Sequence, residues 1–122
     1  MTTATYYPVL ECQGTTREAA SDYQGRWFLT DLEGNSLSAK DYPSLQQVVA
    51  DVKFGYLALT ATGMLRLDIV LDVIEDDESV QSTAYLDGSA IKVVDEGDLA
   101  ATWFENVIGE PCRFVKRLDV AV

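Results

Sequence analysis

Histidine is missing from this sequence, and cysteine, proline and basic residues are scarce. The 122 residues include two cysteines and three prolines, and nine basic residues face twenty acidic ones, for a formal net charge of −11. The absence of histidine excludes His-based catalytic triads, His-dependent zinc sites and imidazole general bases. Nine scattered basic residues cannot neutralise a phosphate backbone, so we expect no nucleic-acid partner. No apolar run approaches the roughly 18 residues of a membrane-spanning helix, so we expect no membrane association.

The two cysteines, Cys12 and Cys112, lie near opposite ends of the chain. Two cysteines do not make a disulfide scaffold, and the N-terminus lacks the basic region and apolar run of a secretory signal. We therefore expect a cytoplasmic protein with reduced thiols. Without a histidine partner, each cysteine is expected to be a small buried hydrophobic residue and not a nucleophile.

The length indicates one domain spanning residues 1–122, and 48% hydrophobic residues supply enough material for a core. The high net charge favours solubility, and we expect a monomer. The basic residues cluster once, at Arg113, Lys116 and Arg117. We favour a row of ion pairs along a strand edge for this trio, and the alternative is a local anion-binding patch.

Alternation of apolar and polar residues dominates the sequence and predicts strands. The clearest example is 65–73, where every second residue is apolar. Thr62-Gly63, Asp87-Gly88 and the segment 31–35 carry turn residues that favour hairpins. Strands are predicted at 6–11, 26–30, 37–39, 47–53, 56–61, 65–73, 80–86, 89–94 and 112–120.

One segment has helical spacing of its apolar residues, from Asp98 to about residue 108. Asp95 or Asp98 can cap its start, and Gly109 can adopt the left-handed conformation at its end. Trp103 and Phe104 on this helix are interpreted as core residues, with ligand stacking as the alternative. A short helical turn is predicted at 44–47.

Together these elements predict a mainly β fold, a partly open antiparallel β-barrel of about seven to nine short strands with one helix at about 98–108 packed on it. The acidic block at 75–78 is interpreted as a solvated loop. A calcium site is the alternative, but the block lacks the ligand spacing of an EF-hand loop. We predict no metal site.

Three segments carry a family resemblance. Residues 7–14 (YPVLECQG) are similar to a Y-P-V-K-S-C-x-G opening, and 25–34 with 42–45 follow a D-R-x-W strand, a D-x-x-G hairpin and a P-x-L turn. Residues 95–113 resemble a helix opened by Gly-Asp and followed by Gly-x-Pro-Cys-Arg. These patterns resemble the N-terminal β-barrel domain that precedes the MOSC domain, which is named for the C-terminal part of molybdenum-cofactor sulfurases. The resemblance implies a β-barrel accessory to a catalytic domain whose cysteine ligates molybdenum or carries sulfur, and we expect a stand-alone copy without that domain.

The sequence departs from the family where amidoxime-reducing relatives hold their anionic cofactor. The Lys and Ser of Y-P-V-K-S and the Arg of D-R-x-W correspond to Leu10, Glu11 and Gly25. An anionic pterin needs cationic or N–H donors, so no cofactor is expected, and the molybdenum cofactor is implied by the resemblance alone. The remaining candidates for cofactor contacts are Arg26 and Lys40. Arg26 lies one residue from the family's arginine and so faces the other side of a strand unless a β-bulge re-aims it.

Paired carboxylates are the remaining enzymatic possibility, with Glu11, Asp95 and Asp98 as candidates for acid/base work. We favour a structural role for Asp95 and Asp98 at the helix N-terminus, and we predict no catalytic residue.

The leading hypothesis is therefore a non-catalytic binding or interaction module. The alternatives are an accessory subunit that docks on a separately encoded MOSC domain to complete a molybdenum-cofactor oxidoreductase or sulfur-carrier enzyme, and an enzyme or small-ligand carrier that uses the barrel mouth.

Overall fold

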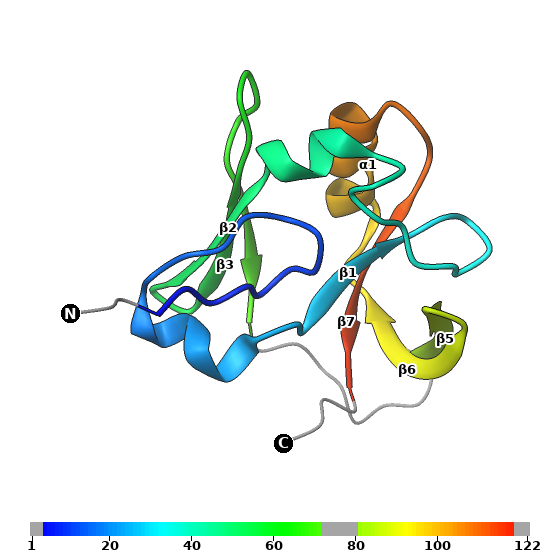
Figure 1. Cartoon of the computed structure of the whole chain (residues 1–122), viewed down its shortest axis with the longest axis horizontal. Coiled ribbons are helices and arrows are strands. Elements are labelled where there is room, and N and C mark those ends of the chain that lie inside the picture. Colours follow the sequence, from blue (N-terminus) through cyan, green and yellow to red (C-terminus); the bar gives the residue numbers. More distant parts are fainter. Residues whose placement is uncertain (1–3, 72–80, 119–122) are drawn as a thin grey trace.

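Within residues 4–71 and 81–118, the part of the chain that this computed structural model describes, seven short strands form two antiparallel sheets (Figure 1). The first sheet has the order β1-β7-β6-β5 and the second has the order β2-β3-β4. The strands are β1 (Trp27–Thr30), β2 (Val49–Lys53), β3 (Tyr56–Thr60), β4 (Leu67–Val70), β5 (Gln81–Leu86), β6 (Ser89–Asp95) and β7 (Arg113–Arg117). The helical elements are α1 (Asp98–Ile108) and the 3-10 turns η1 (Glu18–Tyr23) and η2 (Pro43–Gln47).

Hairpins with permissive turn residues connect neighbouring strands. Asp87 and Gly88 have φ of 51° and 86°, the positive values that a two-residue type I′ turn requires, and they join β5 to β6. Gly63, with φ 77°, lies in the turn that joins β3 to β4. These two predicted hairpins are confirmed, as is the short helical turn at 44–47, which is part of η2.

The four-stranded sheet curls until its two edges meet at one end. The turn after β1 reaches β5, where Ser36 donates its N–H to the carbonyl of Tyr85 (2.8 Å) and Tyr85 donates to the carbonyl of Gly34 (2.8 Å). In the described residues the two sheets do not join into one closed barrel. The prediction of a mainly β, partly open barrel with one helix is therefore confirmed.

Two hydrophobic cores lie on opposite faces of the four-stranded sheet. The larger, here called the inner core, contains Trp27, Leu29 and Phe114 and is completed by the three-stranded sheet and α1. Successive side chains of a strand point to opposite faces, so β1 and β7 supply both cores, and all four residues of β1 are buried. The smaller, here called the outer core, consists of Phe28, Ala84, Val93 and Val115, with Leu10, Leu86 and Ile91 packed against them.

Helix α1 has the predicted bounds and anchors the inner core. Phe104 is fully buried and stacks on Phe114 of β7, with 4.6 Å between the ring centroids. Trp103 is nearly buried, and its indole N–H donates to the carbonyl of Leu65 (2.7 Å). The interpretation of Trp103 and Phe104 as core residues is confirmed. Gly109 ends the helix with φ 83°, as predicted.

The start of α1 differs from the prediction. The N-cap residue is Gly97, and no side chain caps the helix there. The Asp95 carboxylate instead accepts the N–H of Gly97 (2.8 Å), and Asp98 is the first helical residue. Both aspartates bond to Arg113, a partner that the local sequence around the helix does not indicate.

Two predicted strands, 6–11 and 37–39, are wrong. Pro8 has no N–H to donate and Glu11 has a left-handed φ of 71°, so the first segment forms isolated bridges and no continuous ladder. Residues 37–39 contact β1 through the N–H of Leu37 (2.9 Å) but do not extend into a strand.

The strand predicted at 65–73 is shorter than expected, because β4 begins at Leu67 and Leu65 is 90% exposed. The 3-10 turn η1 was not predicted, since its sequence EAASDY lacks helical spacing of apolar residues. Residues 72–80, with the acidic block at 75–78, and residues 119–120 of the last predicted strand lie outside the described residues.

Removal of the Phe104 ring from helix α1 should destabilise the fold strongly. We expect Phe104→Ala to lower the free energy of unfolding by about 3–5 kcal/mol, because it empties a fully buried aromatic site. Leu99→Ala on the same helix is the matched control, since Leu99 is 73% exposed, and its effect should stay within about 0.5 kcal/mol. Urea denaturation measures both, and equal effects would contradict this account of the inner core.

Candidate functional site

Two of the three segments that carry the family resemblance, 7–14 and 25–34, meet at a cavity beside the outer core, here called the Leu10 cavity. Its volume is about 170 Å³. A Cβ placed on Gly25 would lie 3.4 Å from Cδ2 of Leu10, so the three positions at which the sequence departs from the family lie close together. The cavity is lined by Leu10, Glu11, Phe28, Ser36, Leu37, Ser38, Leu86 and Asp87.

Glu11 has a structural role in the wall of this cavity. Its Oε1 accepts the backbone N–H of Ala39 (3.1 Å), and its carbonyl accepts a hydrogen bond from the side-chain amide of Gln46 (2.6 Å). These bonds tie the left-handed residue to η2 and to the segment that precedes η2. The two charged residues of the lining, Glu11 and Asp87, are both acidic.

The predicted cofactor candidates do not line the Leu10 cavity. The β1–β7 register continues without a bulge to the bond from the N–H of Arg117 to the carbonyl of Arg26 (2.7 Å). The guanidinium carbon of Arg26 lies 5.7 Å from the ring centroid of Tyr23, and Lys40 is exposed. The Nε atoms of Arg26 and Arg117 are buried without a hydrogen-bond partner.

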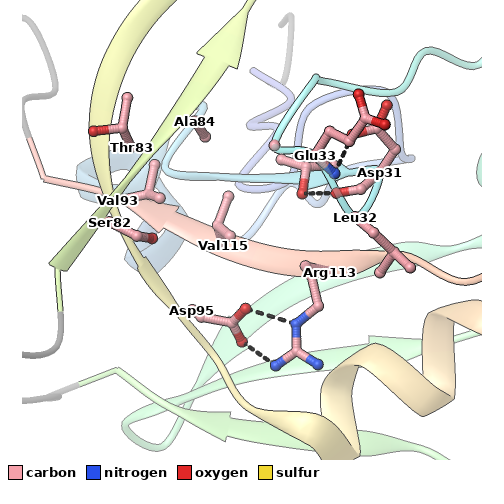
Figure 2. A pocket seen from close by; sticks show the side chains of 12 residues that line it. Asp31, Leu32, Glu33, Ser82, Thr83, Ala84, Val93, Asp95, Arg113 and Val115 are labelled. Carbon is pink, nitrogen blue, oxygen red and sulfur yellow. Dashed lines mark hydrogen bonds and ion pairs between the residues drawn. The ribbon is translucent and has the colours of Figure 1, made fainter.

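The acid/base candidates are distributed over two sites. Asp95 lines a second cavity of about 240 Å³, here called the Arg113 cavity, and Glu11 does not. Figure 2 shows Arg113 facing Asp95 at its edge, with Ser82 and Thr83 of β5 and the Asp31–Glu33 turn around it. Its floor is the buried pair Val93 and Val115 of the outer core. Glu11 and Asp95 therefore lie at different cavities, whereas Asp95 and Asp98 share Arg113.

Arg113 is held by two carboxylates. Its Nε and Nη2 donate to the two oxygens of Asp95 (both 2.6 Å), and its Nη1 donates to Asp98 (2.9 Å). The hydrogen bonds to Asp95, followed by those to Asp98, raise the pKa of the Arg113 guanidinium above its ordinary value. This ion-pair set ties β6, β7 and the start of α1 together.

The other two members of the basic trio bond to carbonyl oxygens. Lys116 is buried and donates to the carbonyl of Leu71 (2.9 Å), and Arg117 donates to the carbonyl of Gly25 (3.4 Å). Lys116 points to the face opposite Arg113 and Arg117, so the three side chains do not gather into one patch. The ion-pair interpretation is confirmed for Arg113.

The turn at the rim of the Arg113 cavity is organised by Asp31. Its carboxylate accepts the backbone N–H groups of Glu33 (2.8 Å) and Asn35 (3.0 Å). The N–H donated by Asn35, ahead of that from Glu33, lowers the pKa of Asp31 below its ordinary value. The sequence predicted a turn at 31–35 but not its contact with β5.

Both cysteines are buried in the inner core and carry free thiols. Burial, with a smaller contribution from the charge of Glu11, raises the pKa of Cys12 to about 12. Burial, followed by the charge of Glu105, raises the pKa of Cys112 to about 11. The prediction that the cysteines are small buried hydrophobic residues is confirmed.

Among 4–71 and 81–118, no three His, Cys, Asp or Glu side chains gather into a group that could hold a metal ion. In the same residues, no helix is both long and apolar enough to cross a bilayer.

Comparison with known proteins decides the family. A model of the MOSC N-terminal beta barrel domain matches residues 2–111. The chain belongs to this family. It is 27% identical over 121 residues to a molybdenum cofactor sulfurase of Oryza sativa subsp. japonica. The aligned region covers 90% of this chain but only 14% of the rice protein. The solution structure of a protein from Bordetella bronchiseptica is similar over 97% of this chain and 91% of that one, with a TM-score of 0.83 and 46% identity.

Both thiols are buried in this MOSC N-terminal fold, and their burial predicts slow alkylation. At pH 8 we expect iodoacetamide to label Cys12 and Cys112 at least about a hundredfold more slowly than a free thiol, because pKa values of about 12 and 11 leave little thiolate. Mass spectrometry of timed samples measures the labelling. Unfolding in urea is the control and should expose both thiols, and rapid labelling of either one in the native protein would contradict the burial described here.

Proposed function

We propose that this chain is a non-catalytic interaction module of the MOSC N-terminal family that does not hold a molybdenum cofactor by itself. The observation that supports the proposal is the charge of the Leu10 cavity, whose charged lining residues are Glu11 and Asp87. An anionic pterin requires cationic or N–H donors. Leu10 offers an apolar side chain, Glu11 adds a negative charge, and Gly25 offers no side chain. The residues present do not fit the group.

Arg117 is the cation that lies close to this site. Its Nη1 is 3.9 Å from the position of a Cβ on Gly25 and donates to the carbonyl of that residue. An anionic ligand that reached Arg117 at this site would also meet the negative charge of Glu11. The positions that the family uses for an anion thus favour a neutral or cationic occupant in this chain.

A second candidate function is an accessory subunit that docks on a separately encoded MOSC domain. The rice relative supports it, because the matched region is 14% of a longer chain named as a molybdenum cofactor sulfurase. In that protein the domain is joined to further chain, and a stand-alone copy would meet the corresponding partner through a non-covalent interface. Such a partner would supply the cations that the Leu10 cavity lacks.

Cofactor retention tests the proposal. The purified protein is mixed with molybdopterin, passed through gel filtration and analysed for pterin and molybdenum. We expect no stoichiometric retention, while the double variant Leu10→Lys with Glu11→Ser should gain binding, because it replaces an apolar and a negative side chain by a positive and a neutral one. Glu11→Gln is the control that removes charge without adding a cation.

Retention of one equivalent by the unmodified protein would overturn the proposal. The same experiment is repeated with a MOSC domain encoded in the same genome. Retention by the mixture, beyond what the MOSC domain retains alone, would favour the second candidate function over a module that acts without the cofactor.

A further inference from the structure

The edge of β4 is the one sheet edge in the described residues that loop backbone does not cover. Residues 8–10 exchange hydrogen bonds with Trp27 at the edge of β1. Gln13 accepts the N–H of Ala50 at the edge of β2 (2.9 Å), and the turn after β1 covers β5 as described above. Uncovered edges are usually protected by short length, charged side chains, proline or a bulge. Strand β4, with the sequence LDIV, is short and carries one charge but contains no lysine and no proline.

The register of β4 shows which of its backbone groups face outward. Leu71 donates its N–H to the carbonyl of Gly55 (3.2 Å), its directly opposite partner in the β3–β4 register. Hydrogen-bonded and non-hydrogen-bonded pairs alternate in an antiparallel ladder, so Leu67 and Ile69 bond to β3. The N–H and C=O groups of Asp68 and Val70 therefore point away from β3, toward the open side.

A groove of about 240 Å³ runs along this edge, here called the β4 groove. Leu67, Asp68, Ile69 and Val70 form one wall, and Glu96, Leu99 and Ala100 form the other. Apolar side chains are exposed on both walls, since Leu99 is 73% exposed and Val70 is 50% exposed. Outward backbone groups beside exposed apolar side chains are the features that an added strand uses for recognition.

We propose that the β4 groove binds an extended segment of a partner polypeptide, which adds as a strand to β4 and alternates apolar with basic side chains. Its backbone pairs with Asp68 and Val70, and its apolar side chains pack on Val70 and Leu99. This inference rests on the proposed interaction function and assigns its surface.

Charge selects the occupant. The groove walls contain Asp68 and Glu96 and no basic side chain. Asp68 pairs with Arg66 (3.1 Å), and Glu96 accepts the indole N–H of Trp27 (2.6 Å). The carboxylate of Asp98 beside Leu99 is 96% exposed and pairs with Arg113 (2.9 Å). A net charge of −11 opposes a second copy of this chain, because the same acidic walls would meet across the interface. A partner segment with basic residues at alternate positions meets these walls with opposite charge.

A peptide titration followed by NMR tests the inference. The probe is the acetylated and amidated peptide Lys-Val-Lys-Val-Lys-Val, added to millimolar concentration to the isotope-labelled full chain. We expect shifts centred on the amides of Asp68 and Val70, and their hydrogen exchange should slow by about tenfold or more on binding. Lys-Pro-Lys-Pro-Lys-Pro is the matched control, which keeps the charge but lacks the backbone donors and should cause neither effect.

Two variants of one position separate backbone pairing from side-chain contact. Val70→Pro removes an outward N–H without removing a bond to β3 and should abolish the slowed exchange at Asp68, whereas Val70→Thr keeps the donor and should retain binding. Circular dichroism checks that both variants fold. If Val70→Pro does not fold, Leu99→Lys takes its place, since it removes an exposed apolar contact and adds a positive charge that repels the basic peptide, and it should weaken binding about tenfold or more.

Three outcomes of the titration overturn the inference. Absence of shifts at millimolar probe, shifts centred on another surface, or self-association that protects Asp68 and Val70 without peptide would all contradict it. A MOSC domain that binds without protecting these two amides would remove this inference and leave the interaction function standing. Stoichiometric cofactor retention by the unmodified protein would contradict the proposed function. The peptide titration would then decide separately whether a strand adds to β4.

Discussion

Strand β7 is buried on both faces, and this double burial is the constraint on which the rest of the structure depends. Phe114 points into the inner core and Val115 into the outer core, so neither face of the four-stranded sheet can be left to solvent. The inner face is covered by α1 and the second sheet. The outer face has no helix on it in the described residues, and the sheet covers that face by curling, with the 31–36 turn held against β5.

This curling also explains where the cavities lie and what they can bind. The Leu10 and Arg113 cavities both border the outer core, where loops rather than regular elements complete the packing. The charged residues of the Leu10 cavity are both acidic. In the Arg113 cavity the single arginine is neutralised by Asp95 and Asp98. The second sheet stays outside this arrangement, which leaves the edge of β4 and the exposed Leu99 as the surface for a partner.

Local patterns predicted the elements whose conformation is decided locally. Alternating residues gave most strands, Asp87-Gly88 gave a type I′ turn, and helical spacing gave α1. The predictions that were wrong or missing concern residues whose conformation is decided by tertiary contacts. Residues 6–11 have strand-like composition but wrap the edge of β1 around Pro8 and a left-handed Glu11. The meeting of Leu10 with Gly25 and the bond from buried Lys116 to the second sheet join residues far apart in the sequence, and no local pattern encodes them. The family resemblance singled out Leu10, Glu11 and Gly25, but only the structure shows that they share one place.

The central claim is that the barrel is open at β4 in the described residues, and we propose that this opening is an interaction surface. Amide hydrogen exchange of the free protein tests it most directly, because it compares neighbouring residues of one strand. The account predicts that Asp68 and Val70 exchange at least about tenfold faster than Leu67 and Ile69, whose N–H groups bond to β3. Equal protection of all four amides would show that the edge is already paired, and it would contradict the account.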